Sequence, residues 1–366
     1  MHTNIASSIQ SRYNVNIIGY LASYIFPIIA YTSIYTSGWW SWVLPFVAFV
    51  CIPLLETLLP RRQENLRPIE EASRTESTMY TWILLGFVPI QCGLIYSLIS
   101  TVGVVEYGVW EWMGILFSVG ICCGSFGINV AHELGHRNDN VSQISAKILL
   151  LTSLYMHFII EHNRGHHKNV ATKHDPASSY RGQTVYQFWC RSIWNSWLDA
   201  WNLEFTRLYR KQKSKWHYSN EMLQFTLIQC TVLLVIGYCF SWYSTLAYII
   251  VGGIGILLLE TINYIEHYGL QRKVRTDLDT NTPKYEKVQP HHSWNSSHSI
   301  GRYLLFELTR HSDHHAHAKR PYPVLRHFTS APQLPFGYPM MILISLIPWF
   351  WFKIMHPLLD QLEISE

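Results

Sequence analysis

The chain has 366 residues; 49% of them are hydrophobic and only 14% are charged. About a quarter of the residues in a soluble domain are usually charged, so this composition argues against an ordinary soluble protein. The net charge of +4 is small and the sequence contains no nucleic-acid-binding module, so we expect no nucleic acid partner. The seven cysteines form no C-x-x-C pair, which excludes a zinc ribbon, a rubredoxin-like site and a c-type haem within this sequence.

Six apolar segments are long enough to cross a bilayer, which takes roughly 20 residues. They are residues 15–35, 39–59, 80–101, 109–130, 222–240 and 243–262. Two further apolar runs are not expected to cross, because 144–160 contains a lysine and a histidine and 336–352 is rich in proline and tryptophan. The sequence therefore predicts an all-α integral membrane fold with six transmembrane helices. A helical cap, formed mainly by 131–221 and 263–366, completes a single domain of residues 1–366.

Basic residues orient these spans. The turns near Gly38, Glu106 and Ser241 contain no lysine or arginine. The loop between the second and third spans contains four arginines, Arg61, Arg62, Arg67 and Arg74. Because basic loops stay on the cytoplasmic side, both termini and the cap are predicted to be cytoplasmic. A crossing at 144–160 would separate the histidine motifs on its two sides, which is a second reason to expect that it does not span.

Nine of the 19 histidines lie in four short motifs, AHELGHR, EHNRGHH, NYIEHYG and RHSDHH. They are His132, His136, His162, His166, His167, His267, His311, His314 and His315. Positions i, i+3 and i+4 share one face of a helix. The pattern thus predicts that 132 with 136, 162 with 166, and 311 with 314 and 315 each aim at one point. His167 is predicted to point to the side, toward a second point.

Imidazoles without thiolates are typical ligands of zinc, copper, iron or nickel. A structural zinc ion uses four ligands, so nine histidines fit two metal ions with four or five ligands each. Carboxylates beside the motifs are predicted to hold ring N–H groups; these are Glu133, Glu161, Glu266 and Asp313. Isolated histidines are interpreted as structural; these are His157, His217, His327 and His356. HELGH also has the spacing of a zinc protease helix, which the other seven histidines do not favour.

The order and spacing of the motifs resemble the membrane-bound alkane monooxygenases over about residues 10–357. The resemblance rests on HELGHR, EHNRGHH with the following DPAS, NYIEHYG, LTRHSDHHAHAKRPY, and PHHSWNSSHS at 290–299. It implies a non-haem enzyme that uses two iron ions, oxygen and electrons from rubredoxin to convert a terminal methyl group to a primary alcohol. It also implies that the nine histidines are the iron ligands and that the chain lies in a bacterial inner membrane.

Three alternatives remain open. Xylene monooxygenases share this chemistry, and YRGQTVY at 180–186 is more similar to them, whereas HNRGHH, RHSDHH and PHHSWN are more similar to the alkane enzymes. Fatty-acid desaturases are more distant, since they typically have three histidine boxes and lack the NYIEHYG form. A metal transporter is the non-enzyme alternative. Transporters usually place their ligands near the bilayer midplane, and these motifs lie at one end of the spans.

Electrons for such a reaction have to come from another protein. An alkane C–H bond gives an acid or base no charge to act on, so a metal cofactor has to supply the oxidising power. The sequence shows no dinucleotide fingerprint and no haem motif, so we expect no bound haem, flavin or nicotinamide. The predicted partner is a rubredoxin-type carrier with its reductase. A basic run is predicted to steer it, or else to contact membrane lipids; its residues are Arg207, Arg210, Lys211, Lys213 and Lys215.

The second span is predicted to contribute to the substrate tunnel. By resemblance this helix lines the tunnel of the alkane enzymes, and a bulky side chain midway along it limits how far an alkyl tail extends. Ala48 and Ile52 lie four residues apart on one face. Because the side chain of Ala48 is small, medium- to long-chain alkanes dissolved in the lipid are the expected substrates.

Overall fold

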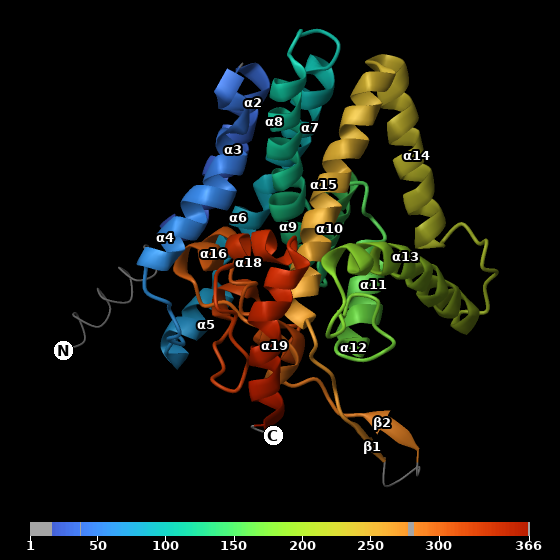
Figure 1. The fold of residues 1–366 in the computed structure, drawn as a ribbon. Coiled ribbons are helices and arrows are strands. Elements are labelled where there is room, and N and C mark those ends of the chain that lie inside the picture. Colours follow the sequence, from blue (N-terminus) through green and yellow to red (C-terminus); the bar gives the residue numbers. More distant parts are fainter. Residues whose placement is uncertain (1–16, 37, 277–281, 365–366) are drawn as a thin grey trace.

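Six helices long and apolar enough to span a membrane form the body of the protein in a computed structural model that describes residues 17–36, 38–276 and 282–364. Their bounds are Ile17–Tyr35, Gly38–Leu58, Met79–Thr101, Val109–Gly135, Glu221–Cys239 and Trp242–His267. They rise from a cap of shorter elements (Figure 1). The six-span prediction is confirmed, although residues 15 and 16 of the first predicted span lie outside the described residues. The fourth and sixth spans continue further than predicted and include His132 and His267.

The first, second and fourth spans contain 3-10 or π turns, and the third is broken by a turn at Gly86. Their elements are η1 (Ala22–Tyr24) and α2 (Ile25–Tyr35); η2 (Gly38–Trp42), α3 (Val43–Phe46), η3 (Val47–Cys51) and α4 (Ile52–Leu58); α6 (Met79–Leu85) and α7 (Phe87–Thr101); and α8 (Val109–Cys122), η4 (Cys123–Ile128) and α9 (Asn129–Gly135). The fifth and sixth spans are the continuous helices α14 (Glu221–Cys239) and α15 (Trp242–His267). Both η3 and η4 are π-helices, an uncommon form found often at functional sites.

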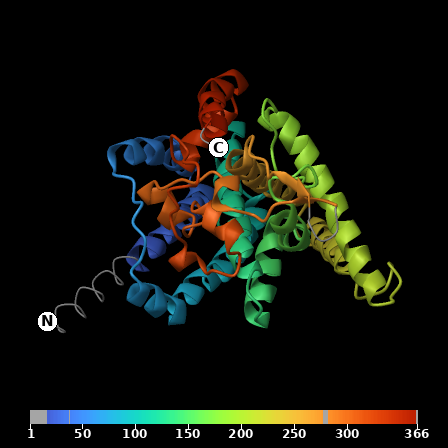
Figure 2. The same cartoon turned by 90° about the horizontal axis from the view of Figure 1, so that it is seen from below.

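The cap contains the remaining elements. They are α5 (Pro68–Glu76), α10 (Asn140–Thr152), α11 (Phe158–Glu161), η5 (His162–His166), α12 (His167–Asn169), α13 (Val185–Arg210), β1 (Val274–Thr276), β2 (Pro283–Tyr285), η6 (Pro290–His292), α16 (Ser299–Leu304), α17 (His311–Ala316), η7 (Tyr322–Val324), α18 (Tyr338–Ser345) and α19 (Pro348–Ile364). The two strands form an antiparallel hairpin with Val274 opposite Tyr285. This hairpin extends from the end of the cap that is farthest from the spans (Figure 1), and Figure 2 views the molecule from that side.

The apolar runs 144–160 and 336–352 are each divided between two helices in the structure. Helix α10 ends at Thr152, the chain turns through Leu154 with a left-handed φ of 54°, and α11 begins only at Phe158. The second run is divided between α18 and α19, with the break at Leu346–Ile347. Neither run is among the helices long enough to span, in agreement with the sequence prediction for the described residues.

Close packing of the fourth and sixth spans depends on glycine. A Cβ atom on Gly255 of α15 would lie 2.7 Å from the Cβ of Cys123 and 2.9 Å from the backbone nitrogen of Gly124. Both distances are shorter than a non-bonded contact allows, so only glycine lets α15 approach η4 this closely. In contrast, Gly253 on the same helix would meet nothing within 4 Å.

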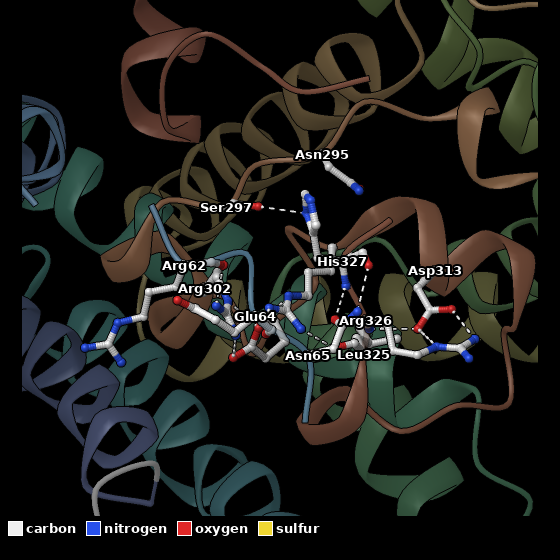
Figure 3. Close-up of polar contacts among 12 residues, drawn as sticks. Arg62, Glu64, Asn65, Asn295, Ser297, Arg302, Asp313, Leu325, Arg326 and His327 are labelled. Atoms are coloured by element: carbon white, nitrogen blue, oxygen red, sulfur yellow. Dashed lines mark hydrogen bonds and ion pairs between the residues drawn. The ribbon is translucent and has the colours of Figure 1, made fainter. Parts of the chain in front are cut away.

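The loop between the second and third spans is tied to the C-terminal part of the cap. Asn65 accepts a hydrogen bond from the backbone N–H of His327 at 2.7 Å, and its amide donates to the His327 carbonyl at 3.0 Å (Figure 3). The His327 ring lies 3.2 Å from the Ser297 hydroxyl. Nearby, Asp313 of α17 binds the guanidinium of Arg326 at 3.0 Å (Figure 3). These contacts hold α17, which contains three of the motif histidines.

A second polar network ties η5 to the fifth span. Glu204 of α13 is fully buried and accepts hydrogen bonds from Arg207, from Arg164 at 3.0 Å, and from the backbone N–H of Glu221 at 2.8 Å. Arg164, which lies between two motif histidines, also binds the Glu221 carboxylate at 3.0 Å. Burial alone would raise the pKa of Glu204, but these hydrogen bonds lower it to about 2. The carboxylate is therefore charged and holds three elements together.

Candidate metal centre

The nine motif histidines gather into two groups. In each group, one ligand atom per residue lies within 4.8 Å of all the others. Group A consists of His132, His136, His162, His167 and His314, and group B consists of His166, His267, His311 and His315. The ligands come from α9, η5, α12, α15 and α17, so the centre forms only when two membrane spans and the cap are assembled.

The two groups divide the motifs differently from the sequence prediction. His162 and His166 were expected to aim at one point, but His162 joins His167 in group A while His166 joins group B. The reason is that η5 is a π-helix, whose wider turn brings i and i+5 to one face. The Nε2 atoms of His162 and His167 are accordingly 3.0 Å apart. The prediction of a single target for 311, 314 and 315 is also wrong, because His314 points into group A.

The ring nitrogens converge as metal ligands do. The Nε2 atom of His314 lies 2.7 Å from that of His132 and 3.1 Å from that of His167. In group B, the Nε2 atom of His311 lies 2.8 Å from that of His315 and 3.2 Å from that of His267. Imidazole nitrogens bound at about 2.1 Å to one ion are separated by roughly 3 to 4 Å.

A hydrogen-bond network among the rings alone does not satisfy these atoms. A neutral imidazole nitrogen offers either one proton or one lone pair, yet the Nε2 atom of His314 faces two others. The Nε2 atom of His136 is buried and has no hydrogen-bond partner. Burial lowers the pKa of His136 to about 4, so its ring is neutral and its lone pair is available. One cation in each group would satisfy these nitrogens, and the donor set fits two metal ions.

The predicted carboxylates lie near the histidines, but only Glu266 contacts one of the nine rings. Its Oε2 atom is 3.2 Å from Nε2 of His311, on the side that faces the metal, and its Oε1 atom accepts from the Tyr338 hydroxyl at 2.6 Å. Glu133 instead binds Arg137 at 3.5 Å. The sequence predicts that Glu133 and Glu266 hold ring N–H groups, because each is next to a motif histidine in sequence. Their contacts in the structure differ from this prediction.

The other two carboxylates make no described hydrogen bond to any of the nine rings. Asp313 contacts the rings and guanidinium groups of His317, Arg320 and Arg326, none of which is among the nine. Glu161 is buried and its Oε1 atom has no hydrogen-bond partner. Adjacency in sequence did not predict contact, because on a helix the next residue points about 100° away.

Asp175 has the role that was predicted for these carboxylates. Its Oδ2 atom lies 2.9 Å from Nδ1 of His166, and the Ser178 hydroxyl donates to the same oxygen at 2.5 Å. With Nδ1 held, the tautomer of His166 directs a lone pair on Nε2 into group B. Although burial would raise it, the contact with His166 lowers the pKa of Asp175. The DPAS sequence after EHNRGHH signals this residue.

Four histidines interpreted as structural lie outside both groups. His217 contacts Ser219, His327 contacts Ser297, and His356 contacts the Tyr268 hydroxyl at 3.0 Å. His157 packs against the Tyr155 ring. A third set that could bind metal is Glu286 with His291 and His292. Its carboxylate is already engaged by the Lys273 N–H and by Arg275, at 2.9 and 3.1 Å, so it is a weaker candidate.

A narrow apolar cavity leads to the histidines. Its volume is about 100 Å³. Its walls come from the first, second, fourth and sixth spans and include Phe26, Ala48, Ile52, Phe126, Leu258 and Leu259. His132 of group A, His311 of group B and the Glu266 carboxylate also line it. Ala48 and Ile52 thus face this cavity, and a molecule within it would contact both groups.

The predicted docking run lies elsewhere. Arg207 is bound to Glu204, and Lys215 lies over the rings of Phe205 and Trp216. The run occupies the last turn of α13 and the start of the loop that leads to α14, at the lateral edge of the molecule (Figure 1).

Comparison with known proteins identifies the family. The model of the fatty acid desaturase family matches residues 110–345. Alkane 1-monooxygenase 2 of Pseudomonas aeruginosa is 38% identical over 323 residues, which cover 87% of this chain and 84% of the relative. The alkane 1-monooxygenase of Acinetobacter baylyi is 36% identical over 92% of this chain and 80% of the relative. The chain belongs to the alkane 1-monooxygenase family.

The chain is also similar, at lower identity, to an enzyme that is named for aromatic compounds. The xylene/toluene monooxygenase hydroxylase component of Pseudomonas putida is 28% identical over 91% of this chain and 87% of the relative. Membership of the alkane 1-monooxygenase family makes the chain a membrane oxidoreductase, which excludes the protease and transporter interpretations.

Proposed function

We propose that the chain is a non-haem di-iron monooxygenase that hydroxylates the terminal methyl group of medium- to long-chain alkanes. One observation supports this most directly: the apolar cavity is lined by both His132 of group A and His311 of group B. An alkyl chain in this cavity would present its end to both metal groups. The apolar walls exclude water from the reacting carbon and hold the substrate by burial alone.

Two iron ions are the proposed cofactor, held by the nine histidines of groups A and B. When bound, they would supply the oxidising power for a C–H bond that no acid or base can attack. The protein's own contribution is to hold neutral imidazoles, to fix the His166 tautomer through Asp175, and to keep the alkyl chain in line. Glu133, Glu161, Glu266 and Asp313 are proposed to support the centre as buried side chains around it.

The balanced reaction requires a donor outside the chain. An alkane, one oxygen molecule, two electrons and two protons give a primary alcohol and one water. A rubredoxin-type carrier with its reductase is the proposed source of the electrons. Because such carriers are soluble proteins of the cytoplasm, the cap and both termini are proposed to face the cytoplasm of a bacterial inner membrane.

The arrangement of the histidines supports the prediction that segment 144–160 does not cross the membrane. His136 and His162 flank the interrupted segment 144–160 and belong to the same group. That segment therefore returns to the side from which it started. Single cysteines at positions 138 and 169, on a background without the native cysteines, would both be labelled from the cytoplasmic side. Labelling of the two sites from opposite sides would contradict the proposal.

Hydroxylation of an aryl methyl group is the second candidate, supported by the similarity to the xylene/toluene enzyme. The test supplies octane, hexadecane and xylene separately to the iron-loaded protein with reduced rubredoxin. The proposal predicts 1-octanol and 1-hexadecanol as the main products and about two irons per chain. Turnover confined to xylene, or activity that is unaffected by iron removal, would contradict it.

A further inference from the structure

Exposed basic side chains surround the β1–β2 hairpin and the segment that follows α12. They are Lys168, Lys173, Lys273, Arg275, Lys284 and Lys287, called here the hairpin patch. Among the described residues of the hairpin, the acidic side chain is Glu286, which is partly buried and paired with Arg275 at 3.1 Å. Asp277 and Asp279, which lie between the two strands in the sequence, are outside the described residues. The described surface is strongly positive.

The hairpin patch is attached directly to the metal-binding segments. The Arg272 guanidinium donates to the carbonyl of Lys168 at 2.9 Å, and the Arg272 N–H donates to the carbonyl of Ala171 at 2.8 Å. Lys168 immediately follows His167 of group A, which in turn follows His166 of group B. Both metal groups are thus reached from this surface within one or two residues of chain.

The loop after the hairpin packs against the other side of group B. The backbone N–H of Trp294 donates to the carbonyl of Glu266 at 2.8 Å, next to His267. The Trp294 indole donates to the carbonyl of Tyr268 at 2.9 Å. The PHHSWN motif therefore connects the hairpin patch to the end of the sixth span, and this connection accounts for a motif that binds neither proposed metal.

We propose that the hairpin patch is the docking surface for an acidic one-electron carrier protein. This inference rests on the proposed function, which needs two electrons for each oxygen molecule reduced and each C–H bond oxidised. The carrier gives up one electron per visit, so two visits complete a turnover. Electron transfer through protein slows steeply with distance, which makes a surface next to ligands of both groups the favourable entry point. Opposite charge steers the carrier to that surface and raises its association rate.

Membrane lipid is the less suitable occupant of this patch. The hairpin extends away from the six spans, whereas lipid headgroups lie where the spans end (Figure 1).

The basic run at 207–215, in contrast, lies close to a membrane span. The fifth span begins shortly after it, at Glu221. Three exposed aromatic side chains lie within or next to the run, and they are Tyr209 (83% exposed), Trp216 (63%) and Tyr218 (81%). Basic residues mixed with exposed aromatics are typical of a membrane interface. That run therefore binds lipid headgroups, and the carrier docks at the hairpin patch.

Charge reversal distinguishes the two surfaces. The test variant is Lys173→Glu with Lys284→Glu and Lys287→Glu, and the matched control is Arg210→Glu with Lys211→Glu and Lys213→Glu. Binding of reduced rubredoxin to the purified, iron-loaded protein is measured directly at low salt. We expect the test variant to weaken binding by about ten-fold or more, and the control by less than about two-fold. Added salt should reduce the difference between wild type and the test variant, because it screens exposed charges.

Turnover separates a docking defect from a damaged centre. With reduced methyl viologen as a small donor, the test variant should hydroxylate octane at the wild-type rate, while its KM for reduced rubredoxin rises. Wild-type-like binding in the test variant, or a loss confined to the 207–215 variant, would overturn the docking proposal. Absence of hydroxylation in the wild type with either donor would instead contradict the proposed function, even if rubredoxin binding depends on the hairpin patch.

Discussion

His132 and His311 line one apolar cavity, although they belong to different histidine groups. They come from the fourth span and from α17, which are far apart in sequence. This relationship indicates where a substrate would react, because a chain in the cavity would meet both groups while most of the remaining walls are apolar.

The depth of the cavity should set the preferred alkane length. Replacing the buried Ala48 with tryptophan would fill space that the cavity now occupies. Overpacking of this kind costs roughly 1–3 kcal/mol for ligands that need the space, which corresponds to a shift of about ten-fold toward shorter alkanes. The measurement is the ratio of octane to hexadecane hydroxylation.

The matched control for Ala48→Trp is Val50→Trp on the same π-helix, since Val50 is exposed and does not line the cavity. Its product ratio should equal that of wild type. An unchanged ratio in Ala48→Trp, at normal expression, would place the alkyl tail elsewhere.

Histidines of one motif are divided between groups A and B. We therefore expect that the metal ion of each group can be lost separately. His162→Ala removes a ligand from group A and His166→Ala removes one from group B. Each variant should fall from about two irons per chain toward one, and hydroxylation should be lost in both. His217→Ala, which changes a ring outside both groups, should retain two irons and wild-type activity. Retention of two irons and full activity in either ligand variant would remove that histidine from the centre.

Asp175 should control how tightly group B holds its metal. Asp175→Asn keeps the size of the side chain but weakens the hydrogen bond that fixes the His166 tautomer. Loss of such a partner typically reduces metal affinity or activity by about 10–100-fold. Competition with a chelator measures the affinity. The control Asp360→Asn, at an exposed ion pair with Arg181, should titrate like wild type. Equal chelator sensitivity in all three proteins would show that Asp175 does not position His166.

Close approach of the fourth and sixth spans should not tolerate a methyl group at Gly255. In Gly255→Ala the new Cβ would lie within 3 Å of Cys123 and Gly124, so the helices would have to separate. We expect a loss of about 1–3 kcal/mol in stability, seen as a lower midpoint of thermal unfolding in detergent. Gly253→Ala meets open space and should be neutral or slightly stabilising, because alanine favours helix. Equal midpoints for the two variants would contradict the packing account.

Glu204 should make the stability of the cap depend on pH. Its pKa is lowered from 4.5 to about 2, so the carboxylate contributes stability that is present above pH 4.5 and is lost as the pH falls toward 2. Glu204→Gln should therefore unfold more easily than wild type at pH 7, and the difference should shrink below pH 4.5. Glu106→Gln, at an exposed turn, should follow wild type throughout. A difference between Glu204→Gln and wild type that stays constant over this range would refute the assignment.

The sequence predicts the spans well because their signal is local. Length and apolarity are sufficient to locate a membrane helix, and the nine histidines stand out by their clustering. Their division into groups A and B could not be predicted, because the π-turn at His162–His166 shifts the register in a way that helical periodicity does not contain. Asp175 was overlooked for a related reason. It lies nine residues beyond His166 and reaches the ring only through the fold of the intervening loop.

Hydroxylation of octane under labelled oxygen is the most direct test of the proposed function. The iron-loaded protein is supplied with octane, reduced rubredoxin and ¹⁸O₂, and the products are analysed by mass spectrometry. The proposal predicts 1-octanol as the main product, with one ¹⁸O atom from oxygen in each alcohol. An alkene in place of the alcohol, or an alcohol oxygen that comes from water, would contradict it.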